Sequence, residues 1–209
     1  RALIMAPHPD DHSHRLILAS KSKSRAAVLK AVGLQFEQIG SGVDEDALKD
    51  ALRAEGASVA KQADLLAETK ALKVSISHAG VVLGCDQMLD LDGVGLDKVG
   101  TRDEARDVLR RLRGKTHILQ SAIVACVEGA PVWRQLSQPR LRMRNFSDAF
   151  LEDYLDAIGD AAFEGVGCYQ VEGRGALLFD RIEGDYFSIL GMPLLPLLQW
   201  LRDRGTIPA

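Results

Sequence analysis

The chain has 209 residues, of which 46% are hydrophobic and 26% charged, which excludes a disordered or fibrous protein and allows a sizeable core. Lysine and arginine number 26 and aspartate and glutamate 29, so the formal net charge of −3 provides no basic excess for binding a nucleic acid polymer. No apolar run approaches the roughly 20 residues that span a bilayer. We therefore expect a cytoplasmic protein without nucleic acid or membrane partners.

The first fourteen residues are polar and irregular and contain the sequence HPDDH at positions 8–12. We predict a flexible N-terminal extension over residues 1–14 and one domain over residues 15–209. HPDDH resembles the HPDDE motif of zinc-dependent deacetylases of sugar amides, but zinc needs at least three ligands in a fixed geometry. His12 replaces the glutamate of that motif, and His78 and His117 are widely separated, so the flexible extension is favoured.

The rest of the chain alternates apolar runs with helical periodicities. Its first half predicts a strand at 16–19, a helix at 26–32, a strand at 34–40, helices at 45–54 and 58–75, and a strand at 81–85. Its second half predicts a helix at 103–112, strands at 117–127 and 132–144, a helix at 149–158, a strand at 177–182 and an amphipathic helix from residue 193. Helices and strands mixed at this density indicate an α/β fold.

The three cysteines, Cys85, Cys126 and Cys168, lie in apolar or glycine-rich surroundings. Their number is odd and none belongs to a C-x-x-C motif. This pattern predicts buried, reduced thiols rather than disulfides or metal ligands.

A cluster of hydroxyl and cationic side chains lies between the first strand and the first helix. Ser20, Ser22 and Arg25 belong to this cluster, and the free N–H groups of a helix N-terminus bind anions. Arg25 adds a planar guanidinium that matches phosphate oxygens. The segment is therefore a candidate phosphate site, although a solvated, capped helix start has the same composition.

Carboxylates and lysines elsewhere form a second set of candidates. Asp86 closes the strand at 81–85, which predicts a charge at the carboxyl edge of the sheet, where ligands of α/β proteins bind. Glu45 lies in an acidic cluster that suits Mg²⁺ but also suits a helix N-terminus. Lys70 and Lys98 are isolated cations, which by themselves are more often solvated surface residues.

Taken in order, these motifs resemble the Maf family of nucleoside triphosphate pyrophosphatases over nearly the whole chain, from about residue 15 to 205. The matching segments are LASKSKSR at 18–25, VDE at 43–45, LAETKA at 66–71, LGCDQ at 83–87, DK at 97–98, GKTH at 114–117, GCY at 167–169, EG at 172–173 and LGMP at 190–193. The departures are Lys23 and Ser24 for a Pro-Arg pair, Val99 for a proline and Gly165 for a lysine.

The resemblance implies a single α/β domain, similar to the Maf and inosine triphosphatase folds, with a mixed sheet, flanking helices and two lobes around a nucleotide cleft. It implies hydrolysis of a nucleoside triphosphate between the α and β phosphates, a divalent metal (Mg²⁺ or Mn²⁺), a homodimer, and a house-cleaning role linked to arrest of cell division. The catalytic residues would be Asp86, Glu45, Lys70 and Lys98, with Glu45 and Asp86 holding the metal and Ser20, Ser22 and Arg25 binding the substrate. A non-catalytic nucleotide-binding regulator of cell division on the same fold is the alternative.

Three positions are associated in this family with the preferred base, and here they are Ser24, Gln87 and Glu172. Members acting on dTTP and UTP typically have arginine, threonine and glutamine there, whereas relatives preferring 7-methyl-GTP resemble this chain at the last two positions. A guanine edge offers two adjacent N–H donors that a carboxylate accepts in parallel, and 7-methylation adds positive charge. The sequence therefore favours 7-methyl-GTP, with UTP, dTTP and CTP as competing substrates.

Overall fold

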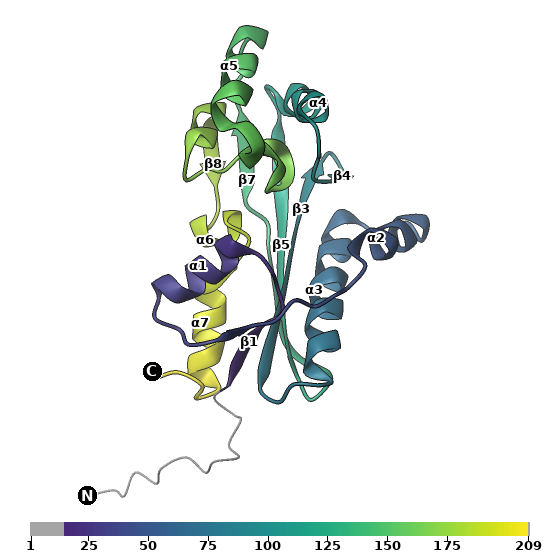
Figure 1. Ribbon diagram of the computed structural model, residues 1–209, viewed down its shortest axis with the longest axis vertical. Coiled ribbons are helices and arrows are strands. Elements are labelled where there is room, and N and C mark those ends of the chain that lie inside the picture. Colours follow the sequence, from purple (N-terminus) through teal and green to yellow (C-terminus); the bar gives the residue numbers. More distant parts are fainter. Residues whose placement is uncertain (1–14, 209) are drawn as a thin grey trace, which may run out of the picture.

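The computed structural model describes residues 15–208, which form an eight-stranded mixed sheet covered by helices (Figure 1). The strands are β1 (Leu16–Leu18), β2 (Glu37–Gln38), β3 (Val81–Leu91), β4 (Val94–Leu96), β5 (Thr116–Val127), β6 (Ala130–Ser137), β7 (Arg140–Met143) and β8 (Phe179–Glu183). Their order is β2-β1-β3-β5-β7-β8, with β4 on β3 and β6 on β5. β1 is parallel to β2 and β3, and the other pairings are antiparallel.

Seven α-helices lie in the described part of the chain. They are α1 (Lys23–Ala31), α2 (Glu45–Ala54), α3 (Val59–Ser75), α4 (Arg102–Leu112), α5 (Asp148–Ile158), α6 (Tyr186–Ile189) and α7 (Leu194–Asp203). Side chains of Ser22, Asp44, Ser58, Thr101 and Ser147 cap the first five by accepting a backbone N–H. Three short 3₁₀ segments, Gly159–Phe163, Val166–Cys168 and Arg174–Leu178, connect α5 to β8.

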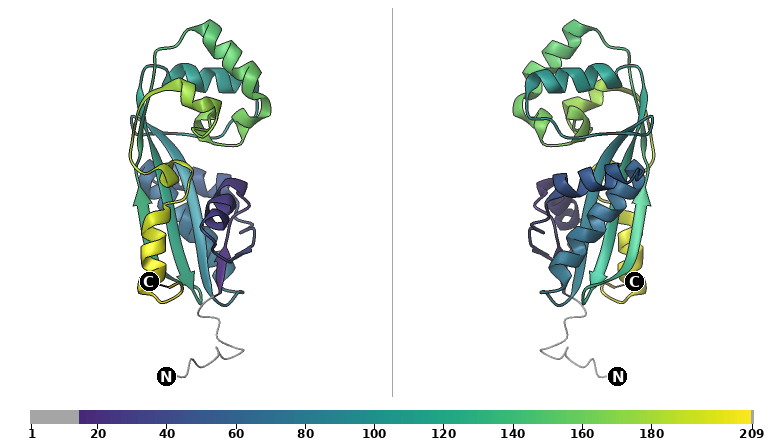
Figure 2. Two further views of the ribbon diagram at one scale, coloured as in Figure 1. Left: turned by 90° about the vertical axis from the view of Figure 1, so that its left-hand side faces the viewer. Right: turned by 90° about the vertical axis from the view of Figure 1, so that its right-hand side faces the viewer.

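The two long strands, β3 and β5, run through both lobes of the molecule. In the lower lobe of Figure 1, their alternating side chains separate two apolar cores: Leu83 and Ile123 pack toward α1 and α7, and Val82 and Val124 pack toward α3. In the upper lobe a third core joins the ends of these strands to α4 and α5. Figure 2 shows the α4–α5 layer and α1 on the same side of the long strands.

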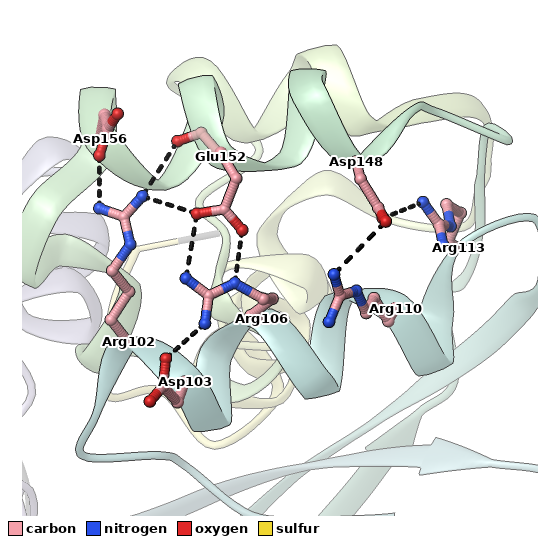
Figure 3. A network of polar contacts seen from close by, with 8 residues as sticks. All are labelled: Arg102, Asp103, Arg106, Arg110, Arg113, Asp148, Glu152 and Asp156. Atoms are coloured by element: carbon pink, nitrogen blue, oxygen red, sulfur yellow. Dashed lines mark hydrogen bonds and ion pairs between the residues drawn. The ribbon is translucent and has the colours of Figure 1, made fainter.

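A ladder of ion pairs joins α4 to α5 (Figure 3). Arg113 Nη1 lies 2.8 Å from Asp148 Oδ1, and Arg102 Nη2 lies 3.0 Å from Glu152 Oε2. The arginines recur every three or four residues along α4, so they share one face of the helix. Each exposed pair contributes little alone, and the pairs together connect α5 to α4.

The α/β fold and most of the predicted elements are confirmed, but β4 and α6 were not predicted and the following predicted elements differ. β3 continues to Leu91 because the buried side chains of Met88 and Leu89 extend its apolar sequence. The prediction that Asp86 lies at the end of a strand was therefore wrong. The strand predicted at 132–144 is two strands that separate before Pro139, since proline cannot donate to a ladder. The strand predicted at 34–40 shortens to two residues.

The prediction of unpaired cysteines is confirmed, because Cys85, Cys126 and Cys168 are all buried and free. Burial raises the pKa of the Cys85 thiol to about 11, which makes it unreactive. Residues 1–14, with the HPDDH sequence, lie outside the described residues. Within residues 15–208, no helix is long and apolar enough to cross a membrane.

Candidate active site

A cavity of about 1070 Å³ lies between the two lobes. The β1–α1 turn, the N-terminus of α2, the middle of β3 and the segment after α5 all contribute to its walls. It brings together all ten residues that the sequence singled out: Ser20, Ser22, Ser24, Arg25, Glu45, Lys70, Asp86, Gln87, Lys98 and Glu172. Residues from positions 20 to 172 therefore meet in one cavity.

Asp86 faces α3 from the middle of β3. Gly84, two residues earlier, faces the same helix, and a Cβ there would lie 2.0 Å from Ala67 O and 2.7 Å from Ala71 N. The glycine therefore allows β3 and α3 to approach until their backbones nearly touch. This close approach brings Lys70 of α3 alongside Asp86.

Lys70 bridges two carboxylates that come from different elements. Its Nζ lies 2.8 Å from Asp86 Oδ1 and 2.9 Å from Glu45 Oε2. The side chains of Lys70 and Asp86 are only 6% and 7% exposed, whereas that of Glu45 is 44% exposed. Helix α2 begins at Glu45, so its N-terminus lies beside the buried pair. The ammonium of Lys70 therefore links α3 to both β3 and the start of α2.

One oxygen of Asp86 has no partner within the described chain. Its Oδ2 is buried and has no hydrogen-bond partner among residues 15–208. An unpaired buried oxygen is costly unless a ligand, an ion or a water satisfies it. Asp86 and Glu45 together provide two carboxylates in the cavity. Among residues 15–208, no group of three or more histidine, cysteine, aspartate or glutamate side chains is placed to hold a metal ion. Two carboxylates fit Mg²⁺, which completes its shell with water and substrate phosphates.

The β1–α1 turn lines the cavity next to β3, and hydrogen bonds fix the Arg25 side chain there. Arg25 donates from Nη1 to Cys85 O at 3.1 Å and to Ser20 Oγ at 3.4 Å, and from Nε to Gly191 O at 3.0 Å. Ser22 caps α1 by accepting from the Arg25 N–H at 3.3 Å. Nη2 of Arg25 has no partner within the described chain and is available to an anion. The predicted phosphate-binding segment is thus a preorganised cationic turn at a helix N-terminus.

Lys98 enters the cavity from the connection between β4 and α4. Desolvation of its ammonium, reinforced by the nearby Arg25 charge, lowers the pKa of Lys98 below its usual value. It makes no ion pair or hydrogen bond within residues 15–208. An unpaired cation among other cations is suited to a polyanionic ligand.

The three positions associated with base preference differ in their surroundings. Gln87 points away from Asp86, and its Nε2 donates to Ser121 Oγ at 2.8 Å and to the carbonyls of Ser188 and Ile189 at 3.0 Å. The hydroxyls of Ser24 and Ser22 lie 2.9 Å apart. Glu172 is exposed at the cavity wall. Gln87 is therefore fixed by the protein, whereas the Glu172 carboxylate is free to meet a ligand.

The cavity is also lined by residues that the sequence analysis did not assign to the site, and Lys49 and Asp97 are a charged pair among them. Lys49 follows Glu45 by one helical turn, and Asp97 precedes Lys98, so both spacings were visible signals. Their Nζ and Oδ1 atoms lie 3.2 Å apart.

Comparison with known proteins decides the family. A family model described as Maf-like protein matches residues 15–204. The chain belongs to the Maf family. A protein of Hyphomonas neptunium named nucleoside triphosphate pyrophosphatase is 50% identical over 191 residues, which cover 91% of this chain and 96% of the relative. A protein of Caulobacter vibrioides with the same name is 50% identical over 190 residues, covering 91% and 96% of the two chains.

A third Maf relative carries a more specific name. The 7-methyl-GTP pyrophosphatase of Brucella abortus is 44% identical over 194 residues, covering 92% of this chain and 98% of the relative. These relatives span almost the full described domain. The predictions of the Maf family and of a hydrolase are confirmed.

Proposed function

We propose that this Maf protein is a nucleoside triphosphate pyrophosphatase, which cleaves the bond between the α and β phosphates and releases a nucleoside monophosphate and pyrophosphate. The observation that carries the proposal is the unpaired Oδ2 of Asp86, buried in a cavity that is also lined by the cationic β1–α1 turn, which lies next to β3. Hydrolysis of a phosphoanhydride needs an oriented water and neutralised phosphate charge, and this arrangement offers both.

In the proposed reaction each residue has a separate task. Asp86 orients the attacking water and accepts its proton through Oδ2, while Lys70 holds the other carboxylate oxygen in place. Arg25 and Lys98, with the Ser20 and Ser22 hydroxyls, hold the triphosphate and offset the charge that develops on the leaving pyrophosphate. These groups are preorganised, so little rearrangement precedes the chemistry.

Glu45 and Asp86 are the residues that would hold a divalent metal, Mg²⁺ or Mn²⁺. When bound there, such an ion supplies further neutralisation of phosphate charge. The exposure of the Glu45 side chain (44%) leaves it room to exchange its contact with Lys70 for a contact with a cation. Removal of divalent ions by EDTA is expected to abolish turnover without unfolding the protein.

We propose 7-methyl-GTP as the preferred substrate, with UTP, dTTP and CTP as weaker ones. Glu172 lines the cavity with a free carboxylate, which suits the paired N–H donors of a positively charged guanine edge. The Brucella abortus relative named 7-methyl-GTP pyrophosphatase supports this choice. A house-cleaning role linked to cell division, a cytoplasmic location and a homodimer are part of the same proposal, carried by the family resemblance.

A panel of nucleoside triphosphates tests the proposal, with products identified by chromatography and assays run with Mg²⁺ and with EDTA. We expect equimolar monophosphate and pyrophosphate, with the highest kcat/KM for 7-methyl-GTP. Release of orthophosphate instead of pyrophosphate would contradict the assigned bond. Tight nucleotide binding without any turnover would support the alternative of a non-catalytic regulator of cell division.

A further inference from the structure

An acidic residue outside the proposed catalytic set links two segments that line the cavity, the β4–α4 connection and α2. Asp97 lies in the connection between β4 and α4, and its carboxylate lies between two cations of α2. Its Oδ1 is 3.2 Å from Lys49 Nζ, and its Oδ2 is 2.7 Å from Arg53 Nη2. Glu45, Lys49 and Arg53 are spaced by four residues, so one face of α2 presents the Glu45 carboxylate and both partners of Asp97.

The bridge is charged and partly shielded from water. Burial acts to raise the pKa of Asp97, but the hydrogen bond from Arg53 and the charge of Lys49 outweigh it and lower the pKa. The Lys49 side chain is 16% exposed, and those of Arg53 and Asp97 are 36% and 42% exposed. One carboxylate that engages two cations from successive helical turns restricts the connection more than a single surface pair does.

The bridge matters because Lys98 has no anchor of its own among the described residues. Its ammonium makes no ion pair or hydrogen bond there, so the path of the backbone sets its place. On the α4 side, Glu104 accepts the Gly100 and Thr101 N–H groups at 3.0 Å and fixes that end of the connection. On the other side, Asp97 immediately precedes Lys98 and ties the connection to α2, the helix that begins with Glu45.

We propose that Asp97 is a positioning residue of the active site. Its bridge to Lys49 and Arg53 holds the β4–α4 connection against α2, and this keeps the Lys98 ammonium opposite Glu45 and Asp86. The inference rests on the proposed function, in which Lys98 neutralises triphosphate charge. A displacement of about 1 Å in such a group costs up to about 100-fold in rate.

The kinetic test uses Asp97→Asn, Arg53→Gln and the double variant, with pyrophosphate release from the best nucleotide as the readout. Arg53 contacts Asp97 but does not line the cavity, so any effect of its substitution reaches the chemistry through Asp97. We expect each single variant to lower kcat about 10-fold while KM changes less than about twofold. The double variant should be no slower than the slower single variant, because both substitutions break the same bridge.

Asp148→Asn is the matched control. Asp148 also lies between two arginines, Arg110 and Arg113, but on the far side of α4 and outside the cavity. Its loss should leave kcat and KM at wild-type values. Wild-type kcat in Asp97→Asn and Arg53→Gln, or losses that multiply in the double variant, would overturn the positioning role.

Hydrogen exchange supplies a readout that does not depend on turnover. We expect the amides of residues 96–101 to exchange at least several-fold faster in Asp97→Asn and Arg53→Gln than in the wild type and in Asp148→Asn. If these amides exchange at the wild-type rate in both variants, the bridge does not hold the connection. If they exchange faster but kcat stays at the wild-type value, the bridge does not position Lys98. If the wild-type chain hydrolyses no nucleotide, the proposed function fails, while exchange still decides whether Asp97 holds the connection.

Discussion

Lys70 Nζ lies 2.8 Å from Asp86 Oδ1, and this buried ion pair connects α3 to the middle of β3. The same ammonium reaches Glu45 at 2.9 Å, so one lysine joins three elements of the cleft. Since Asp86 Oδ2 remains unpaired within the described chain, the pair holds the carboxylate in place and occupies only one of its two oxygens. Lys70 therefore joins α3 to β3 and α2, and its positive charge lies between the Asp86 and Glu45 carboxylates.

Asp86→Asn should lower turnover by about 100-fold or more, because an amide cannot accept the proton of the attacking water. Pyrophosphate release under saturating nucleotide measures the effect. Asp90→Asn is the control, since Asp90 lies on the same strand outside the cavity and accepts from Gln120 Nε2 at 3.0 Å. Wild-type turnover in Asp86→Asn would refute the assigned role of Asp86.

Lys70→Met should destabilise the fold by about 3 to 5 kcal/mol, because it leaves the buried Asp86 carboxylate without its cation. Urea unfolding monitored by circular dichroism measures the loss. Lys61→Met is the matched control: Lys61 lies on the same helix and pairs with Asp64 at 3.6 Å, but its side chain is exposed. Equal stability of the two variants would show that the buried pair is not a stabilising contact.

Gly84→Ala should lower the free energy of unfolding by about 3 kcal/mol or more, because the Cβ of the alanine would collide with the backbone of α3. The collision would also displace Lys70, so pyrophosphatase activity should fall. Thermal unfolding and pyrophosphate release measure the two effects. Gly100→Ala is the control for stability, since a Cβ there meets no atom within 4 Å. A Gly84→Ala protein with wild-type stability and turnover would contradict the need for this close approach.

Local periodicity was sufficient to predict the α/β fold, and the ordered motifs that resemble the Maf family indicated the family and ten of the residues that line the cavity. What they could not predict depends on contacts across the fold. Asp86 was predicted at the end of a strand because a charged residue follows the apolar run 81–85. In the structure β3 continues past Asp86, and Lys70 of α3 pairs with its buried carboxylate. The sequence analysis did not indicate the pairing of Lys49 with Asp97, because it joins segments that are distant in sequence.

Glu172→Gln should shift the preference from 7-methyl-GTP toward UTP and dTTP by about 10-fold in the ratio of kcat/KM values. A charge-assisted hydrogen bond contributes roughly 1.5 kcal/mol more when its acceptor is ionised. Glu164→Gln is the matched control, since Glu164 lines the same cavity but accepts a hydrogen bond from Gln170 Nε2 at 2.9 Å. An unchanged ranking of nucleotides in Glu172→Gln would remove the basis for the proposed base selectivity.

The last prediction concerns His117, which is buried beside the wall of the cavity. Its Nε2 and the Tyr169 hydroxyl form a hydrogen bond of 2.6 Å, and its Nδ1 has no partner within residues 15–208. Burial lowers the pKa of His117 to about 4 in the folded protein, whereas an unfolded histidine titrates near 6.5. Between these values the unfolded chain binds the additional proton.

The unfolding free energy should therefore fall by about 3 kcal/mol from this group alone as the pH drops from 6.5 to 4, with no loss above 6.5. His117→Gln keeps a polar group near Tyr169 but cannot titrate, so its stability should decline less steeply over this window. Urea unfolding at a series of pH values gives the slopes, and parallel curves for His117→Gln and the wild type would contradict a buried neutral imidazole.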